Sequence, residues 1–126
     1  MKNYSITRLL LGLLAVLGAG HAQAAQVRVN NVTVQRTVVT SDPRIGNCMA
    51  ILDKQLSSFG LTCVGRQVTF SCDGVLTSKD VAWRMFDVAQ LASVRKLLVN
   101  LTVDDTHKAP DNRTCFASRV ELMPSK

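Results

Sequence analysis

The chain is 126 residues long, 47% hydrophobic and 5% aromatic, with a formal net charge of +6 and four cysteines. This length allows one domain, or two at most, and the hydrophobic fraction excludes intrinsic disorder. Lys and Arg are scattered, with Arg95-Lys96 the longest basic run, so the basic stripe that nucleic-acid binding requires is missing. The positive charge is compatible with an acidic surface ligand, such as a sialylated glycan or a lipid headgroup.

Residues 1–24 show the three parts of a secretory signal peptide. Lys2 and Arg8 form the basic start, residues 9–17 the apolar run, and Ala22-Gln23-Ala24 the small-residue cleavage site. The apolar run is too short for a transmembrane anchor. We therefore expect cleavage after Ala24 and export from a bacterial cell, leaving a secreted or periplasmic domain of residues 25–126. Loss of Lys2 and Arg8 lowers its net charge from +6 to +4.

All four cysteines (Cys48, Cys63, Cys72 and Cys115) lie in this mature part. An even number in a small exported domain predicts two disulfides, because the compartment is oxidising. The spacings do not match a zinc site, and we expect neither a metal nor a cofactor. Four cysteines permit three pairings, among which their spacing does not choose.

The first half of the mature chain predicts strands. Residues 26–40 alternate apolar and polar side chains, and the extra polar residue at Asn30-Asn31 indicates a bulge within one long strand. Residues 47–56 fit either a strand or a helix; a strand is favoured because no N-cap precedes them and a turn sequence ends them early. Residues 67–72 alternate and predict a third strand.

One helix is expected from residues 77–80, where Thr and Ser caps precede Asp80, to about Val94. Its apolar face comprises Val81, Ala82, Met85, Phe86, Val88, Ala89 and Ala92. The opposite face carries a mixed set of candidates for contact with a second subunit, namely Trp83, Arg84, Asp87, Leu91 and Val94. The alternative is that its apolar members pack under a neighbouring loop.

Two further strands follow the helix. Residues 97–103 are rich in apolar and β-branched side chains and end at two aspartates, residues 106–113 form a polar loop, and residues 115–123 alternate again. The chain is thus mainly β with one helix, in the order β-β-β-α-β-β, which is that of a small five-stranded OB-fold-like barrel. If residues 47–56 are helical instead, an α+β sandwich is expected.

This arrangement bears on the disulfides. A hairpin of the second and third strands, turning near Gly60, places Cys48 roughly opposite Cys72. We therefore favour Cys48–Cys72 with Cys63–Cys115, while a Cys63–Cys72 bridge stays an open alternative.

The sequence offers no catalytic set. All cysteines are expected to be oxidised, and His107, the single mature histidine, falls in the polar loop as a solvated residue. Asp73, Asp104 and Asp105 fit turn and capping positions better than a pair of catalytic carboxylates. We expect a protein that is not an enzyme.

Segment 72–103 joins a cysteine that ends a strand, a Ser/Thr-capped helix with aromatic and alanine residues, and a basic junction into an apolar strand. In these features the chain resembles the receptor-binding B subunits of pentameric bacterial toxins of the subtilase-cytotoxin and pertussis-like types. The resemblance implies an exported, disulfide-bonded OB-fold that forms a ring of five subunits. Its helices would line a central pore, and its sugar-binding pockets would lie on the side of the barrel.

Two functional hypotheses follow. The first is an exported, non-catalytic binding module like a toxin B subunit, oligomeric and directed at a host or envelope glycan. The second is a monomeric periplasmic protein that binds or inhibits a protein partner through the loop of residues 106–113.

Overall fold

The structure, a computed structural model, describes residues 26–125, so the expected signal peptide lies outside the described residues. Within them the protein is mainly β, with one α-helix and two short 3-10 helices. The elements in chain order are β1 (Gln26–Val39), η1 (Pro43–Ile45), β2 (Cys48–Leu52), η2 (Leu56–Phe59), β3 (Gln67–Thr69), α1 (Lys79–Arg95), β4 (Leu98–Lys108) and β5 (Cys115–Leu122).

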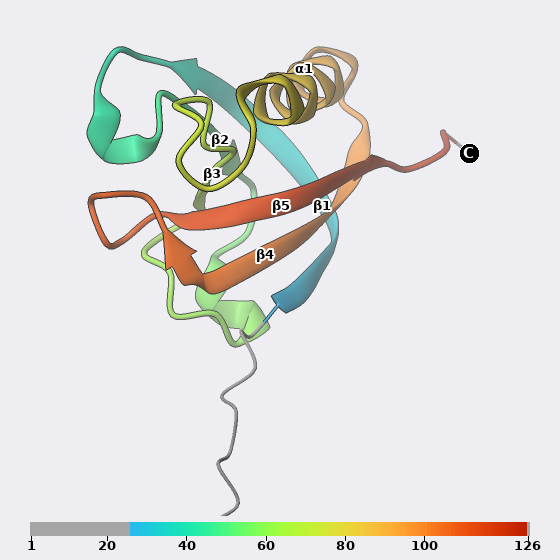
Figure 1. Cartoon of the computed structure of the whole chain (residues 1–126). Helices are drawn as coiled ribbons and strands as arrows, with labels where there is room; N and C mark the ends of the chain where they lie inside the picture. Colours follow the sequence, from blue (N-terminus) through green and yellow to red (C-terminus); the bar gives the residue numbers. More distant parts are fainter. Residues whose placement is uncertain (1–25, 126) are drawn as a thin grey trace, which may run out of the picture.

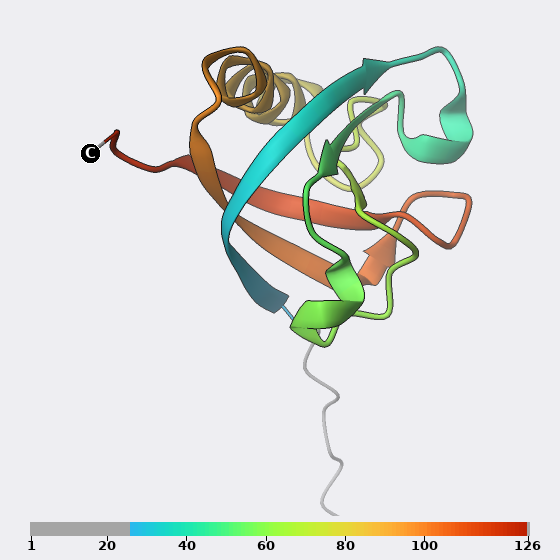
Figure 2. The same ribbon diagram turned by 180° about the vertical axis from the view of Figure 1, so that it is seen from behind.

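The five strands form one mixed sheet that closes on itself in the order β1-β2-β3-β5-β4 (Figures 1 and 2). β1 pairs antiparallel with both β4 and β2, and β5 pairs antiparallel with β4. The remaining contact, β3 with β5, is parallel and short: Val68 lies opposite Cys115 and Thr69 opposite Phe116. Because of this closure, the loops at one end of the sheet lie close together.

The bulge expected in the first strand is confirmed. The register of β1 against β4 shifts between Val29 and Val32, and Asn31 takes a left-handed backbone conformation with φ of 53°. Its N–H donates to the Asn100 side-chain oxygen of β4 at 2.9 Å. The bulge bends β1, so that its first half pairs with β4 and its second half with β2.

Residues Cys48–Leu52 are a strand, as favoured from the sequence. β2 and β3 pair antiparallel, and the two disulfides are Cys48–Cys72 and Cys63–Cys115. This is the pairing favoured by the expected hairpin. The first disulfide joins β2 to the segment after β3, and the second joins the β2–β3 loop to the start of β5.

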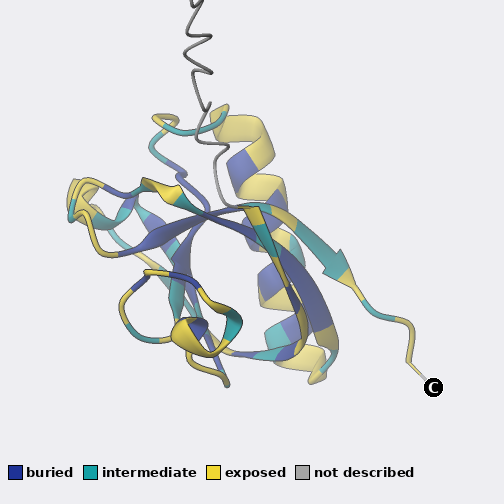
Figure 3. Cartoon of the chain, turned by 90° about the horizontal axis from the view of Figure 1, so that it is seen from below, coloured by how far each residue is buried: buried dark blue, intermediate teal, exposed yellow. Residues whose placement is uncertain are grey.

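The helix has the expected ends. The Ser78 hydroxyl accepts a hydrogen bond from the Val81 N–H at 3.4 Å, and Lys96 ends the helix in a left-handed conformation. α1 packs mainly on β1 and β5, over one end of the sheet (Figure 1), and Figure 3 shows buried residues along its inner side. The buried residues are Ala82, Met85, Phe86, Ala89 and Ala92. Val81, expected on this face, is 46% exposed, because it lies at the edge of the apolar stripe.

Two strand boundaries differ from the sequence-based expectation. β3 ends at Thr69 rather than Cys72, because the backbone turns into the left-handed region at Ser71, where φ is 61°. β4 does not stop at the two aspartates but continues to Lys108. The Asp104 carboxylate is buried and accepts hydrogen bonds from Thr106 and His107, so it shapes an irregular strand instead of ending a regular one. The following loop is correspondingly shorter than residues 106–113.

Removing either disulfide should lower the free energy of unfolding by about 2–5 kcal/mol, because each bridge restricts the unfolded chain. The Cys63→Ser/Cys115→Ser variant should lose about 0.7 kcal/mol more than Cys48→Ser/Cys72→Ser, since the bridges span 52 and 24 residues. Urea unfolding of the two variants beside the oxidised protein measures both quantities. A larger loss for Cys48→Ser/Cys72→Ser would contradict the expected order.

Candidate functional site

Three loops meet beside β3 and form a cleft. They are residues 40–47 between β1 and β2, residues 53–66 between β2 and β3, and residues 109–114 between β4 and β5. The Asp111 N–H donates to the Arg44 carbonyl at 2.9 Å, and the Val64 N–H donates to the Arg113 carbonyl at 3.1 Å. The Cys63–Cys115 disulfide lies next to these contacts in the chain. Backbone bonds and a covalent bridge therefore hold the cleft in shape.

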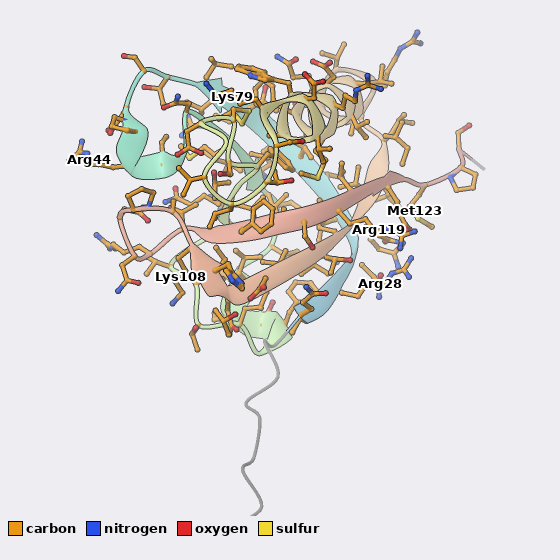
Figure 4. The ribbon with its side chains drawn as sticks, viewed as in Figure 1. Arg28, Arg44, Lys79, Lys108, Arg119 and Met123 are labelled. Atoms are coloured by element: carbon orange, nitrogen blue, oxygen red, sulfur yellow. A yellow bond between two sulfur atoms is a disulfide. The ribbon has the colours of Figure 1, made fainter. Side chains whose placement is uncertain are left out.

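The cleft has a volume of about 290 Å³. Its walls combine apolar and charged side chains from all three loops and from β3, with Arg44 projecting from the β1–β2 loop in Figure 4. The lining residues are Asp42, Arg44, Ile45, Val64, Gln67, Asp111 and Arg113.

Both carboxylates of the cleft are occupied within their own loops. Asp42 caps η1 by accepting from the Arg44 N–H, and it also accepts from the Arg44 guanidinium at 2.7–3.1 Å. These bonds lower the pKa of Asp42 to about 2. Asp111 accepts from the Arg113 N–H, the Thr114 N–H and the Thr114 hydroxyl at 2.7–2.9 Å. Its partial burial acts to raise the pKa of Asp111, but these hydrogen bonds outweigh that effect and lower it.

The groups left for a ligand are mainly donors. The Arg113 side chain is exposed and makes no ion pair within residues 26–125. Arg44 donates to Asp42 through its Nε and one Nη, which leaves its other Nη free. Gln67 donates through its amide nitrogen to the Thr114 hydroxyl at 3.2 Å, and this nitrogen carries a second N–H. Such a cleft suits a ligand that is rich in acceptors, such as an acidic or polyhydroxylated one.

The aspartates and histidine considered from the sequence do not share one site. His107 is exposed, as expected, but it belongs to β4 rather than to a loop, and its Nδ1 lies 2.7 Å from a carboxylate oxygen of Asp104. Asp105 instead accepts from the N–H and hydroxyl of Thr62. Asp73 accepts from the Ser71 hydroxyl in the turn after β3. Each carboxylate thus stabilises a different local structure.

The helix residues expected at a subunit interface share the outward side of α1. Trp83 is 39% exposed and packs edge-on against Phe86, with ring centroids 5.7 Å apart. Leu91 and Val94 are 45% and 78% exposed, so no loop covers them, and Arg84 and Asp87 are also exposed. This face is separate from the three-loop cleft.

The cleft itself was not foreseen from the sequence. Turn signals at Asp42-Pro43 and at Pro110-Asp111 mark two of its loops. Nothing in the sequence places these loops beside each other, because more than sixty residues separate them and only closure of the sheet joins them.

Asp104 and Asp111 should make the fold sensitive to acid. Burial acts to raise the pKa of Asp104, but hydrogen bonds from Thr106 and His107 outweigh it, so the pKa values of both carboxyls are lowered. A carboxyl with a lower pKa in the folded state stabilises the fold above its unfolded-state value of about 3.9, and this contribution is lost as the pH falls through the folded-state value. We expect nearly constant free energy of unfolding between about pH 7 and 5, and a decrease below about pH 4.

Urea unfolding across this range measures the effect. The Asp104→Asn/Asp111→Asn variant should be less stable at neutral pH, because two charged acceptors are lost, and should show a shallower decrease in acid. An unchanged slope in the variant would assign the acid sensitivity to other groups.

Neither a membrane-spanning helix nor a metal-binding cluster is present among the described residues. Within residues 26–125, no helix has the length and hydropathy needed to cross a membrane. In the same part of the chain, no group of three or more His, Cys, Asp or Glu side chains is arranged to hold a metal ion. No protein-family model, no curated protein and no solved structure matches the chain.

Proposed function

We propose that residues 25–126 form an exported, non-catalytic binding module with an OB-fold, whose three-loop cleft binds a glycan. The observation that carries this proposal is the position of the cleft. OB-folds bind oligosaccharides and oligonucleotides on the face of strands 2 and 3 and with the β1–β2 and β4–β5 loops. Here those two loops are joined by the bond from Asp111 to Arg44 and lie against β3.

The chemistry of the cleft favours a glycan over a nucleic acid. Among residues 26–125, no aromatic side chain lines it, whereas single-stranded nucleic acids are held by stacking on aromatic rings within a basic groove. The available Arg and Gln donors suit the hydroxyl and carboxylate oxygens of an acidic sugar.

Export is supported by two independent features. Residues 1–24 have the pattern of a signal peptide. The two disulfides join all four cysteines and leave no free thiol, as expected for a small domain in an oxidising compartment.

A toxin-like module would also associate with copies of itself, as a ring of five if the resemblance holds. The outward face of α1 supports this part of the proposal, because Trp83, Leu91 and Val94 are large apolar side chains that remain exposed. Trp and Arg are enriched in the anchors of protein interfaces, and Arg84 lies beside Trp83 on this helix.

The alternative is a monomeric periplasmic protein that binds or inhibits a protein partner. The β4–β5 loop, residues 109–114, favours it: Asp111 hydrogen bonds, the Ala109–Thr114 backbone bond and the adjacent disulfide fix its shape. A preformed loop loses little conformational entropy on binding a protein.

Binding of oxidised residues 25–126 to arrayed acidic and neutral glycans tests the first hypothesis. Arg113→Ala and Arg44→Ala should each weaken binding about 10- to 150-fold, since a hydrogen bond to a charged group contributes about 1.5–3 kcal/mol. Arg36→Ala, an exposed arginine of β1 outside the cleft, is the matched control and should bind normally. Absence of glycan binding, together with capture of one envelope protein through residues 109–114, would favour the alternative.

Native mass from light scattering tests self-association. The oxidised protein should have about five times the subunit mass if it forms the toxin-like ring. Trp83→Ala should reduce this mass to that of the subunit by removing an interface anchor, while circular dichroism confirms that the variant is folded. A wild-type monomer at all concentrations would remove the pentamer from the proposal.

A further inference from the structure

A second concave surface lies at the C-terminal end of α1, at the opposite side of the molecule from the cleft. Two hollows of about 610 and 450 Å³ adjoin here and share Leu97 and Ser125 in their walls, so we treat them as one surface. Its apolar lining comprises Leu91, Leu97, Leu98 and Met123. In Figure 4, Met123 lies far from Arg44 of the cleft. We call this surface the C-terminal groove.

Among residues 26–125, the charged side chains that line the C-terminal groove are all basic. Arg95 and Lys96 line it, and no acidic residue of the described chain does. Neither cation makes an ion pair within residues 26–125, whereas Arg28 and Arg119 pair with Glu121, and Arg44 pairs with Asp42. The groove thus combines an apolar floor with two cations that have no carboxylate partner in the described structure.

We propose that the C-terminal groove binds an acidic peptide segment of a partner protein, whose apolar side chains enter the groove and whose carboxylates pair with Arg95 and Lys96. Complementary charge around an apolar contact directs encounter and excludes wrong partners. Leu98 in the wall of the groove is 43% exposed, and Val94, which is 78% exposed and precedes Arg95 in the chain, adds apolar surface beyond the walls. This proposal goes beyond glycan binding: the module would hold a second protein at one end while its cleft faces a glycan at the other.

A second copy of this chain fits the groove poorly. A contact between the grooves of two copies would place Arg95 and Lys96 of one copy against the same cations of the other. Trp83 is the exposed apolar residue of α1 that lies one helical turn from two carboxylates, three residues after Asp80 and four before Asp87. Trp83 lies about 18 Å from Arg95 along the helix axis. In the proposed ring, whose helices line a central pore, the axis runs along α1 and each residue keeps its own height, so Trp83 of one copy would not reach the groove of the next.

A lipid surface also fits less well than a peptide. A bilayer presents a broad, nearly flat anionic surface, which contacts amphipathic faces rather than hollows. The C-terminal groove is concave, and its apolar floor is partly recessed, since Leu97 and Met123 are only half-exposed. A protruding side chain of a peptide reaches such a floor.

Fluorescence anisotropy with defined peptides tests the proposal. The probe is a short labelled peptide that alternates leucine with glutamate; the control peptides replace every glutamate by lysine or every leucine by serine. The mature protein should bind the probe and neither control. Arg95→Glu/Lys96→Glu should weaken binding at least tenfold and gain affinity for the lysine peptide, because attraction becomes repulsion at two positions. Leu98→Ser should weaken binding of the probe without this change in preference.

Matched controls separate this result from loss of fold and from the proposed glycan site. Arg36→Glu/Arg66→Glu changes the net charge equally but lies outside the groove, and it should bind the probe normally. The groove variants should retain glycan binding and native mass.

Three outcomes would overturn the proposal. The first is equal binding of the glutamate and lysine peptides. The second is binding of the probe that Arg95→Glu/Lys96→Glu does not change. The third is that the double substitution weakens the binding of a membrane or of a second copy in the way expected for the peptide. Binding to phosphatidylglycerol vesicles tests for the membrane, and the native mass of the groove variants tests for the second copy. Failure of glycan binding alone would leave this proposal intact and remove only the proposed function.

Discussion

The short parallel contact between β3 and β5 is the constraint on which the rest of the structure depends. It involves only two residue pairs, yet it closes the sheet and brings the β4–β5 loop beside two loops that are far from it in the chain. The Cys63–Cys115 disulfide secures this junction, because Cys115 is the residue of β5 that lies opposite Val68. A covalent bond at so short a strand contact compensates for the few backbone hydrogen bonds that such a contact provides.

The acidic and basic side chains around the two concave surfaces have different structural roles. Asp42, Asp104 and Asp111 all accept several hydrogen bonds from their own loops or strands, so these carboxylates stabilise local backbone structure. Cations are used differently. Arg113 in the cleft and Arg95 and Lys96 in the C-terminal groove make no ion pair within the described residues. The protein therefore offers donors and positive charge at its two concave surfaces, which is why both proposals involve acceptor-rich or acidic ligands.

The spatial arrangement of these surfaces suits a module that connects two partners. The cleft is formed by loops at one end of the sheet, and the C-terminal groove by the end of α1 and the residues after β5. Between them, the outward face of α1 presents Trp83, Leu91 and Val94. The cleft shares no residue with the other two surfaces, so its occupation leaves them accessible. The outward face of α1 adjoins the C-terminal groove, because Leu91 lines the groove and Val94 lies next to Arg95 in the chain.

The sequence by itself determined local structure: the helix from its Ser78 cap to the basic residues Arg95-Lys96, and the bulge at Asn30-Asn31. It favoured, without deciding, a strand within residues 47–56 and the observed disulfide pairing, and the structure confirms both. Such features depend on caps, alternation and turn residues within a few positions of each other. It misplaced the end of β4, because the polar Asp104 is buried by hydrogen bonds that alternation does not reveal. The cleft and the C-terminal groove were decided only by the tertiary structure. Arg44 and Arg113 become neighbours through closure of the sheet, and Leu97 and Met123 through the antiparallel pairing of β4 with β5. Contacts between residues so distant in the chain leave no periodic signal in the sequence.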